Sequence, residues 1–129
     1  MTMENAVSDQ FDTVSFEDLV LAGGQQPDNF TFGLIGFGSD YIVSRYNAVE
    51  SIGSGLRAAH VIGKHVFDEV AICMNNFMIA QRFLDESELD EIVPYVLTLR
   101  MKPTPVRLRM MKSTRAETQF LLIERKAAT

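Results

Sequence analysis

Hydrophobic and polar residues alternate along much of this chain after about residue 29, whereas the residues before it show a helical spacing only briefly. A period of two predicts strands, and a spacing of three to four predicts helices. The alternating stretches occur early in the main part of the chain and again in its last third. We therefore predict an N-terminal cap or arm, residues 1–28, followed by one domain, residues 29–126, built around a sheet.

The arm contains one predicted helix. Ser15 and Asp18 have the spacing of a capping box, in which each residue satisfies the other's backbone N–H. Phe16 and Leu19 then share one face of the helix, and the glycine pair at 23–24 is expected to end it. An arm held by so few apolar contacts should open more easily than the rest of the protein.

The main domain begins with a predicted hairpin and ends with three predicted strands. The stretches expected to form strands are residues 30–36, 41–46, 93–101, 106–111 and 118–125. Several short helices should lie between them, with the longest at residues 76–84, followed by a solvated acidic run at 85–90. This order predicts an α+β domain with a five-stranded antiparallel sheet whose helices cover one face.

Composition and charge narrow the possible functions. A length of 129 residues allows one domain with one substantial core. The net charge of −5 argues against binding to nucleic acids or to anionic membranes, which requires a basic surface. No apolar run is long enough to span a membrane, and the N-terminus lacks the pattern of a signal peptide. Together with the single cysteine, this predicts a cytoplasmic protein.

Cys73 is the only cysteine, so it cannot form an intramolecular disulfide. It could be a buried small hydrophobic residue, a reactive nucleophile or an attachment point for a covalent group. His60 and His65 lie in a glycine-punctuated stretch without a second cluster of ligands, so we expect no metal site. The sequence also shows no set of nucleophile, base and orienting group, and we expect no enzyme activity.

Four short strings of residues are similar, in the same order, to those of the photoactive yellow proteins. The strings are residues 46–50 (YNAVE), 61–64 (VIGK), 70–73 (VAIC) and 101–106 (MKPTPV). Proteins of this family are small bacterial blue-light receptors with the PAS fold, and they carry 4-hydroxycinnamic (p-coumaric) acid as a cysteine thioester. The resemblance extends from about residue 30 to residue 126, with different lengths after Cys73.

The resemblance implies that Cys73 is the thioester attachment point and that Tyr46 and Glu50 donate hydrogen bonds to the phenolate. These two residues lie four apart across a predicted junction of strand and helix, where their side chains could converge. If Glu50 is buried there, desolvation raises its pKa and keeps it protonated. Ser54 stands where the family usually has a threonine that supports the tyrosine, and Met101 where it has a methionine that assists recovery.

The chain departs from the family at two positions near the expected pocket. The family's gating arginine falls at Leu56, and Arg57, one residue later, could take its place. Ile72 replaces the proline that usually precedes the cysteine. The signature of a flavin-binding PAS relative is absent, so we expect no flavin.

The family mechanism implies trans–cis isomerisation by light, proton transfer from Glu50 and partial unfolding of the N-terminal arm. Because the sequence shows no output domain, the signal would pass to a separate, unidentified partner protein, and we expect a monomer or a weak dimer. One alternative stays open. The chain could be a PAS sensor or interaction domain without a covalent chromophore, in which Cys73 only packs.

Overall fold

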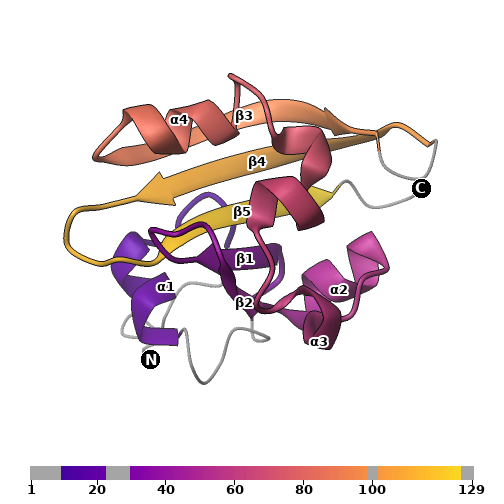
Figure 1. Cartoon of the computed structure of the whole chain (residues 1–129), viewed down its shortest axis with the longest axis horizontal. Coiled ribbons are helices and arrows are strands. Elements are labelled where there is room, and N and C mark those ends of the chain that lie inside the picture. Colours follow the sequence, from indigo (N-terminus) through magenta and orange to yellow (C-terminus); the bar gives the residue numbers. More distant parts are fainter. Residues whose placement is uncertain (1–9, 23–29, 99–101, 126–129) are drawn as a thin grey trace, which may run out of the picture.

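The computed structural model describes residues 10–22, 30–98 and 102–125. Its centre is one antiparallel sheet with the strand order β2-β1-β5-β4-β3 (Figure 1). The strands are β1 (Gly33–Phe37), β2 (Val43–Tyr46), β3 (Leu89–Leu97), β4 (Thr104–Lys112) and β5 (Gln119–Arg125). The predicted α+β class and five-stranded antiparallel sheet are confirmed.

The short helices of the middle segment cover one face of the sheet, which we call the inner face. They are α2 (Ala48–Ser54), α3 (Ala58–Val61), η2 (Val66–Val70), η3 (Ile72–Met74) and α4 (Ala80–Asp85). The larger hydrophobic core lies between them and the inner-facing residues of the strands, such as Leu108 and Leu121. None of the described helices has the length and apolar character needed to cross a membrane.

Residues 10–22 cover part of the opposite, outer face with a second hydrophobic core. The helix α1 (Phe16–Ala22) packs against residues of β4 and β5 that alternate with those of the inner core. The predicted capping box is confirmed, because Asp18 N donates to Ser15 Oγ (3.0 Å) and Ser15 N donates to Asp18 Oδ2 (3.2 Å). The glycines expected to end this helix lie outside the described residues.

The predicted helix over residues 76–84 is wrong in its extent, because α4 begins only at Ala80. Asn76 Oδ1 accepts hydrogen bonds from the backbone N–H groups of Met78 (3.0 Å) and Ile79 (3.1 Å). A side chain that binds the following backbone in this way competes with helical hydrogen bonding. The chain therefore makes a turn before the helix starts.

The predicted start of the third strand at residue 93 is wrong, whereas the acidic residues of the run at 85–90 are exposed, as expected. β3 begins at Leu89, which is buried, so the end of the acidic run is part of the sheet. Asp90 accepts hydrogen bonds from Arg109 Nε (2.8 Å) and Nη2 (3.0 Å). Arg109 is only 7% exposed, and Asp90 supplies the partner that its buried charge requires.

Candidate functional site

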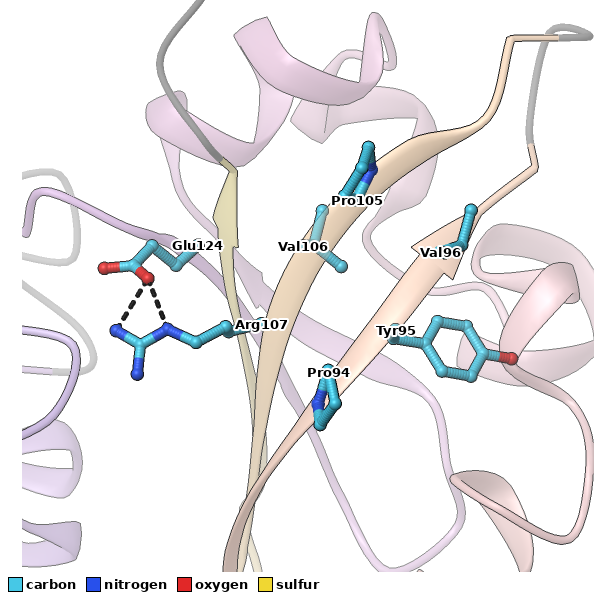
Figure 2. Close-up of a pocket in the computed structure, with 7 residues that line it drawn as sticks. All are labelled: Pro94, Tyr95, Val96, Pro105, Val106, Arg107 and Glu124. Carbon is cyan, nitrogen blue, oxygen red and sulfur yellow. Dashed lines mark hydrogen bonds and ion pairs between the residues drawn. The ribbon is translucent and has the colours of Figure 1, made fainter.

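One hollow of the described surface is an open groove on the outer face, with a volume of about 410 Å³. Figure 2 shows Pro94, Val96 and Pro105 along it and the ion pair between Arg107 and Glu124 at its end. The groove carries neither the cysteine nor a buried titratable group. The chemistry-bearing residues lie instead on the inner face.

A smaller cavity on the inner face brings together Tyr46, Glu50, Ser54 and Cys73. The other residues that line it are mostly apolar: Ile35, Leu56, Val70, Ala71, Met74, Leu97 and Arg125. Its volume is about 20 Å³, which is room for about one water molecule. Four of the six predicted site residues therefore lie around one interior space.

Tyr46 ends β2 and is 7% exposed. Its hydroxyl lies 2.6 Å from Ser54 Oγ, which also accepts a hydrogen bond from the backbone N–H of Leu56 (3.0 Å). Ser54 can therefore donate its own hydrogen to the Tyr46 oxygen and leave the Tyr46 hydrogen for another acceptor. Burial, together with the nearby Glu50, raises the pKa of Tyr46 to about 12, although Ser54 and Arg125 act to lower it. Tyr46 is thus a neutral donor at physiological pH.

Glu50 is placed by the N-terminus of α2. The buried side chain of Asn47 caps this helix, because its Oδ1 accepts a hydrogen bond from Glu50 N (3.0 Å). The same Oδ1 accepts from Leu34 N (2.9 Å), and Asn47 Nδ2 donates to the carbonyl of Phe32 (2.9 Å). These bonds fix the start of α2 against β1 and direct the Glu50 side chain inward, where only 4% of the residue is exposed.

Arg125, the last residue of β5, holds the Glu50 carboxylate with two hydrogen bonds. Arg125 Nη1 donates to Glu50 Oε1 (2.7 Å) and Nη2 donates to Oε2 (3.0 Å). Desolvation raises the pKa of Glu50 above its ordinary value, and the hydrogen bonds and charge of Arg125 oppose this rise. For Arg125, burial disfavours the charged guanidinium and lowers its pKa, but the hydrogen bonds and the charge of Glu50 have the larger combined effect. The pKa of Arg125 is therefore raised.

Sequence reasoning missed Arg125, because a cation at the end of the last strand carries no local motif. The only available signal was the alternation along β5, which places residue 125 on the same face as the inner-core residues Leu121 and Ile123.

Two glycines leave the room that this ion pair occupies. A Cβ on Gly33 of β1 would lie 2.1 Å from Glu50 Oε1. A Cβ on Gly53 of α2 would lie 2.5 Å from Arg125 Nη1 and 2.7 Å from its Cζ. Both distances are shorter than van der Waals contact allows, so the close approach requires glycine at these positions.

Cys73 lies in η3 and is half-buried at the edge of the cavity. Its carbonyl oxygen accepts a hydrogen bond from Tyr95 Oη (2.6 Å) and one from Asn76 Nδ2 (3.3 Å). Asn76 Nδ2 also donates to Tyr95 Oη (2.6 Å). These contacts tie the cysteine's backbone to β3, and no sequence motif had indicated Tyr95 or Asn76.

The remaining predicted positions do not join this cluster. Arg57 is exposed, precedes α3 and is not among the residues that line the cavity, whereas Leu56 is. Met101 lies outside the described residues. His65 Nδ1 accepts hydrogen bonds from two backbone N–H groups at the start of η2, which is a capping role. Within the described parts of the chain, no group of histidine, cysteine and acidic residues could hold a metal ion.

The donor set fits the p-coumaroyl group that the sequence resemblance implies. A thiol, a tyrosine hydroxyl and a buried carboxyl group line the same mostly apolar cavity. A benzene-sized ring needs a volume on the order of 150 Å³, which exceeds the present cavity. Side chains that line the cavity must therefore move to admit the ring, and Arg125 can do so because 21% of its side chain is exposed.

Comparisons with known proteins identify relatives of this chain. No model of a protein family matches the chain. The chain is 30% identical over 104 residues to the photoactive yellow protein of Halochromatium salexigens, covering 78% of this chain and 83% of the relative. It is 27% identical over 106 residues to that of Rhodothalassium salexigens, covering 80% and 85%.

A solved structure gives the same result. The photoactive yellow protein domain of the sensor histidine kinase Ppr from Rhodospirillum centenum has a TM-score of 0.76 and 28% identity to this chain. The match covers 84% of this chain and 98% of that domain. Sequence and structure thus agree on the PAS fold, and the chain belongs to the photoactive yellow protein family.

Proposed function

We propose that this protein is a blue-light photoreceptor that carries p-coumaric acid as a thioester on Cys73. The observation that supports this most directly is the shared cavity of Cys73, Tyr46 and Glu50. In the attachment step, the Cys73 thiolate attacks the carbonyl carbon of an activated p-coumaroyl compound. A sulfur–carbon bond forms, and the activating group leaves with the electron pair of the bond that breaks. When bound, the group supplies visible absorption and light-driven trans–cis isomerisation.

Tyr46 and Glu50 would stabilise the phenolate end of the group. A buried anion needs hydrogen-bond donors to offset its desolvation. The Tyr46 hydroxyl can donate because Ser54 satisfies its oxygen. Glu50 can donate only when it is protonated, and burial favours that form by raising its pKa.

The signal would arise when Glu50 passes its proton to the phenolate and remains as a buried carboxylate. A buried carboxylate costs several kcal/mol until Arg125 pairs with it again, and this cost is comparable to the stability of a weakly held segment. We expect the N-terminal arm to open in response, since its described residues pack on the outer face through an apolar cluster separate from the inner core. A few polar contacts support this packing, such as the hydrogen bond from Arg109 Nη1 to the Phe11 carbonyl (2.9 Å) and the ion pair between Arg107 and Asp12. The opened state would act on an unidentified partner protein in the cytoplasm, with the receptor a monomer or a weak dimer.

One observation favours the alternative function, a PAS sensor without a covalent chromophore. The cavity of about 20 Å³ is much smaller than the ring, and Arg125 occupies the position beside Glu50. In that case Cys73 would be a packing residue.

Reconstitution separates the two functions. Purified protein is incubated with an activated ester of p-coumaric acid, and Cys73→Ala is treated in parallel. We expect a thioester adduct on Cys73 by mass spectrometry and a visible band that bleaches in blue light, both absent from Cys73→Ala. A folded protein that gains neither adduct nor colour would overturn the photoreceptor proposal and favour the alternative.

A further inference from the structure

We infer that Arg125 is the counter-ion of the inner cavity. In the cofactor-free protein it holds Glu50 as a carboxylate, and an anionic ring that enters the cavity takes over the guanidinium and leaves Glu50 protonated. The first half of this inference concerns the chain alone. The second half rests on the proposed function.

The geometry of the pair assigns the charges. Both oxygens of Glu50 accept hydrogen bonds from the two terminal nitrogens of Arg125. This forked arrangement matches an ionised carboxylate, because a protonated carboxyl group would use one oxygen as a donor. The arginine itself remains charged at any physiological pH.

The charge count of the cavity explains why the ring would displace Glu50. The titratable residues that line it in the described chain are Tyr46 from β2, Glu50 from α2, Cys73 from η3 and Arg125 from β5. With Tyr46 neutral and Cys73 acylated, one cation remains for two anions, the phenolate and Glu50. A buried net charge is costly, so one anion must be neutralised, and Glu50 does this by taking one proton from solvent.

The position of Arg125 allows it to change partners. Its side chain is 21% exposed, whereas that of Glu50 is 5% exposed, so the guanidinium lies at the solvent side of the pair. Withdrawal of Arg125 from Glu50 also enlarges the cavity, which the ring requires. Arg125 thereby supplies a cation beside Glu50. Leu56, at the position of the family's gating arginine, has no charge, and the exposed Arg57 does not line the cavity.

The test measures the proton affinity of Glu50 in the cofactor-free protein, using infrared spectroscopy with carboxyl-labelled glutamate. In the wild type, Glu50 should be ionised at neutral pH. Arg125→Met removes the cation and should increase the proton affinity of Glu50 by about tenfold or more, as expected for a carboxylate that loses an adjacent arginine. Glu50→Gln identifies the signal, and Arg125→Lys, which keeps a cation, should resemble the wild type.

Gly53→Ala tests the same contact without removing the charge. The added methyl group would collide with the guanidinium, and alanine favours the helix, so the variant should fold. It should increase the proton affinity of Glu50 as Arg125→Met does, and should have no further effect in the Arg125→Met background. Ile52→Ala, on the exposed surface of the same helix, is the matched control and should leave Glu50 unchanged.

The outcomes separate this inference from the proposed function. If Arg125→Met and Gly53→Ala both leave the titration of Glu50 as in the wild type, Arg125 is not the counter-ion. This result does not depend on whether pigment can be attached. In protein loaded with p-coumaric acid, the signal of protonated Glu50 should appear at neutral pH, and a Glu50 that stays ionised after loading would overturn the exchange of partners.

Discussion

The N-terminal cap should open separately from the rest of the protein, and Leu19→Ala tests how strongly it is held. Leu19 is fully buried in the outer-face core between α1 and the sheet. Replacing a buried leucine by alanine costs about 2–5 kcal/mol of stability. We expect a cost at the lower end of this range, because the residues around Leu19 can partly fill the space that its side chain leaves. A cost of about 2 kcal/mol increases the opened population of the cap by about 30-fold.

Leu21→Ala is the matched control, because Leu21 lies in the same helix and is 75% exposed. Both substitutions change leucine to alanine in one helix, so any effect of helix propensity is shared. A surface substitution of this kind usually changes stability by less than about 0.5 kcal/mol. The difference between the two variants therefore isolates the burial of Leu19.

Native-state hydrogen exchange measures the opening directly. The backbone N–H groups of Val14 and Leu19 are suitable probes, because they donate to Gln10 O (3.0 Å) and Ser15 O (3.2 Å) within the cap. They should exchange about 30-fold faster in Leu19→Ala than in Leu21→Ala, while the amides of β5 should change less. Equal exchange of the cap amides in the two variants would refute the idea that this core holds the cap.

Three other predictions concern the inner cavity. Desolvation raises the pKa of Glu50 in the folded protein above its ordinary value of 4.5, so the folded state binds more protons than the unfolded state in this pH range. The free energy of unfolding should therefore fall as the pH rises from about 4.5 through the raised pKa. Urea titrations should show that Glu50→Gln lacks this fall; parallel pH profiles would contradict it. Tyr95→Phe removes the hydrogen bond to the Cys73 carbonyl, so it should cost about 1 kcal/mol and speed alkylation of Cys73. An unchanged alkylation rate would show that Tyr95 does not restrain the cysteine. In reconstituted protein, Glu50→Gln should keep the pigment and shift its absorption to the red, because an amide is a weaker donor than a carboxylic acid; an identical spectrum would remove Glu50 from the phenolate.

The fold could be predicted from the sequence wherever a local pattern determines the structure. The alternation along β4 and β5 indicated the strands, and the spacing of Ser15 and Asp18 indicated the start of α1. The errors arose where a side chain binds the backbone or a distant partner. Asn76 accepts hydrogen bonds from the backbone N–H groups that follow it, so α4 begins later than predicted. Asp90 is part of β3 and pairs with Arg109 of β4. Neither contact has a sequence pattern.

The site shows the same division. Tyr46 and Glu50 lie at a fixed spacing across the junction of β2 and α2, so their approach to one space could be expected from local structure. Arg125 is 75 residues beyond Glu50 and reaches it only because β5 pairs with β1 in the middle of the sheet. Long-range pairing of this kind depends on the topology of the whole sheet, which no local pattern specifies.

The cavity and the cap lie on opposite faces of the sheet, and Asn47 connects them. Its side chain accepts from Glu50 N on one side and bonds to the backbone of Phe32 and Leu34 on the other. The side chains of Phe32 and Leu34 belong to the outer-face core that packs against α1. A displacement of Glu50 and the start of α2 would therefore act, through the buried bonds of Asn47, on the strand residues that hold the cap. Neutralising Glu50 or separating it from Arg125 changes the interactions at the start of α2, which Asn47 joins to Phe32 and Leu34. The packing of Leu19 in the outer-face core then determines how readily the cap opens.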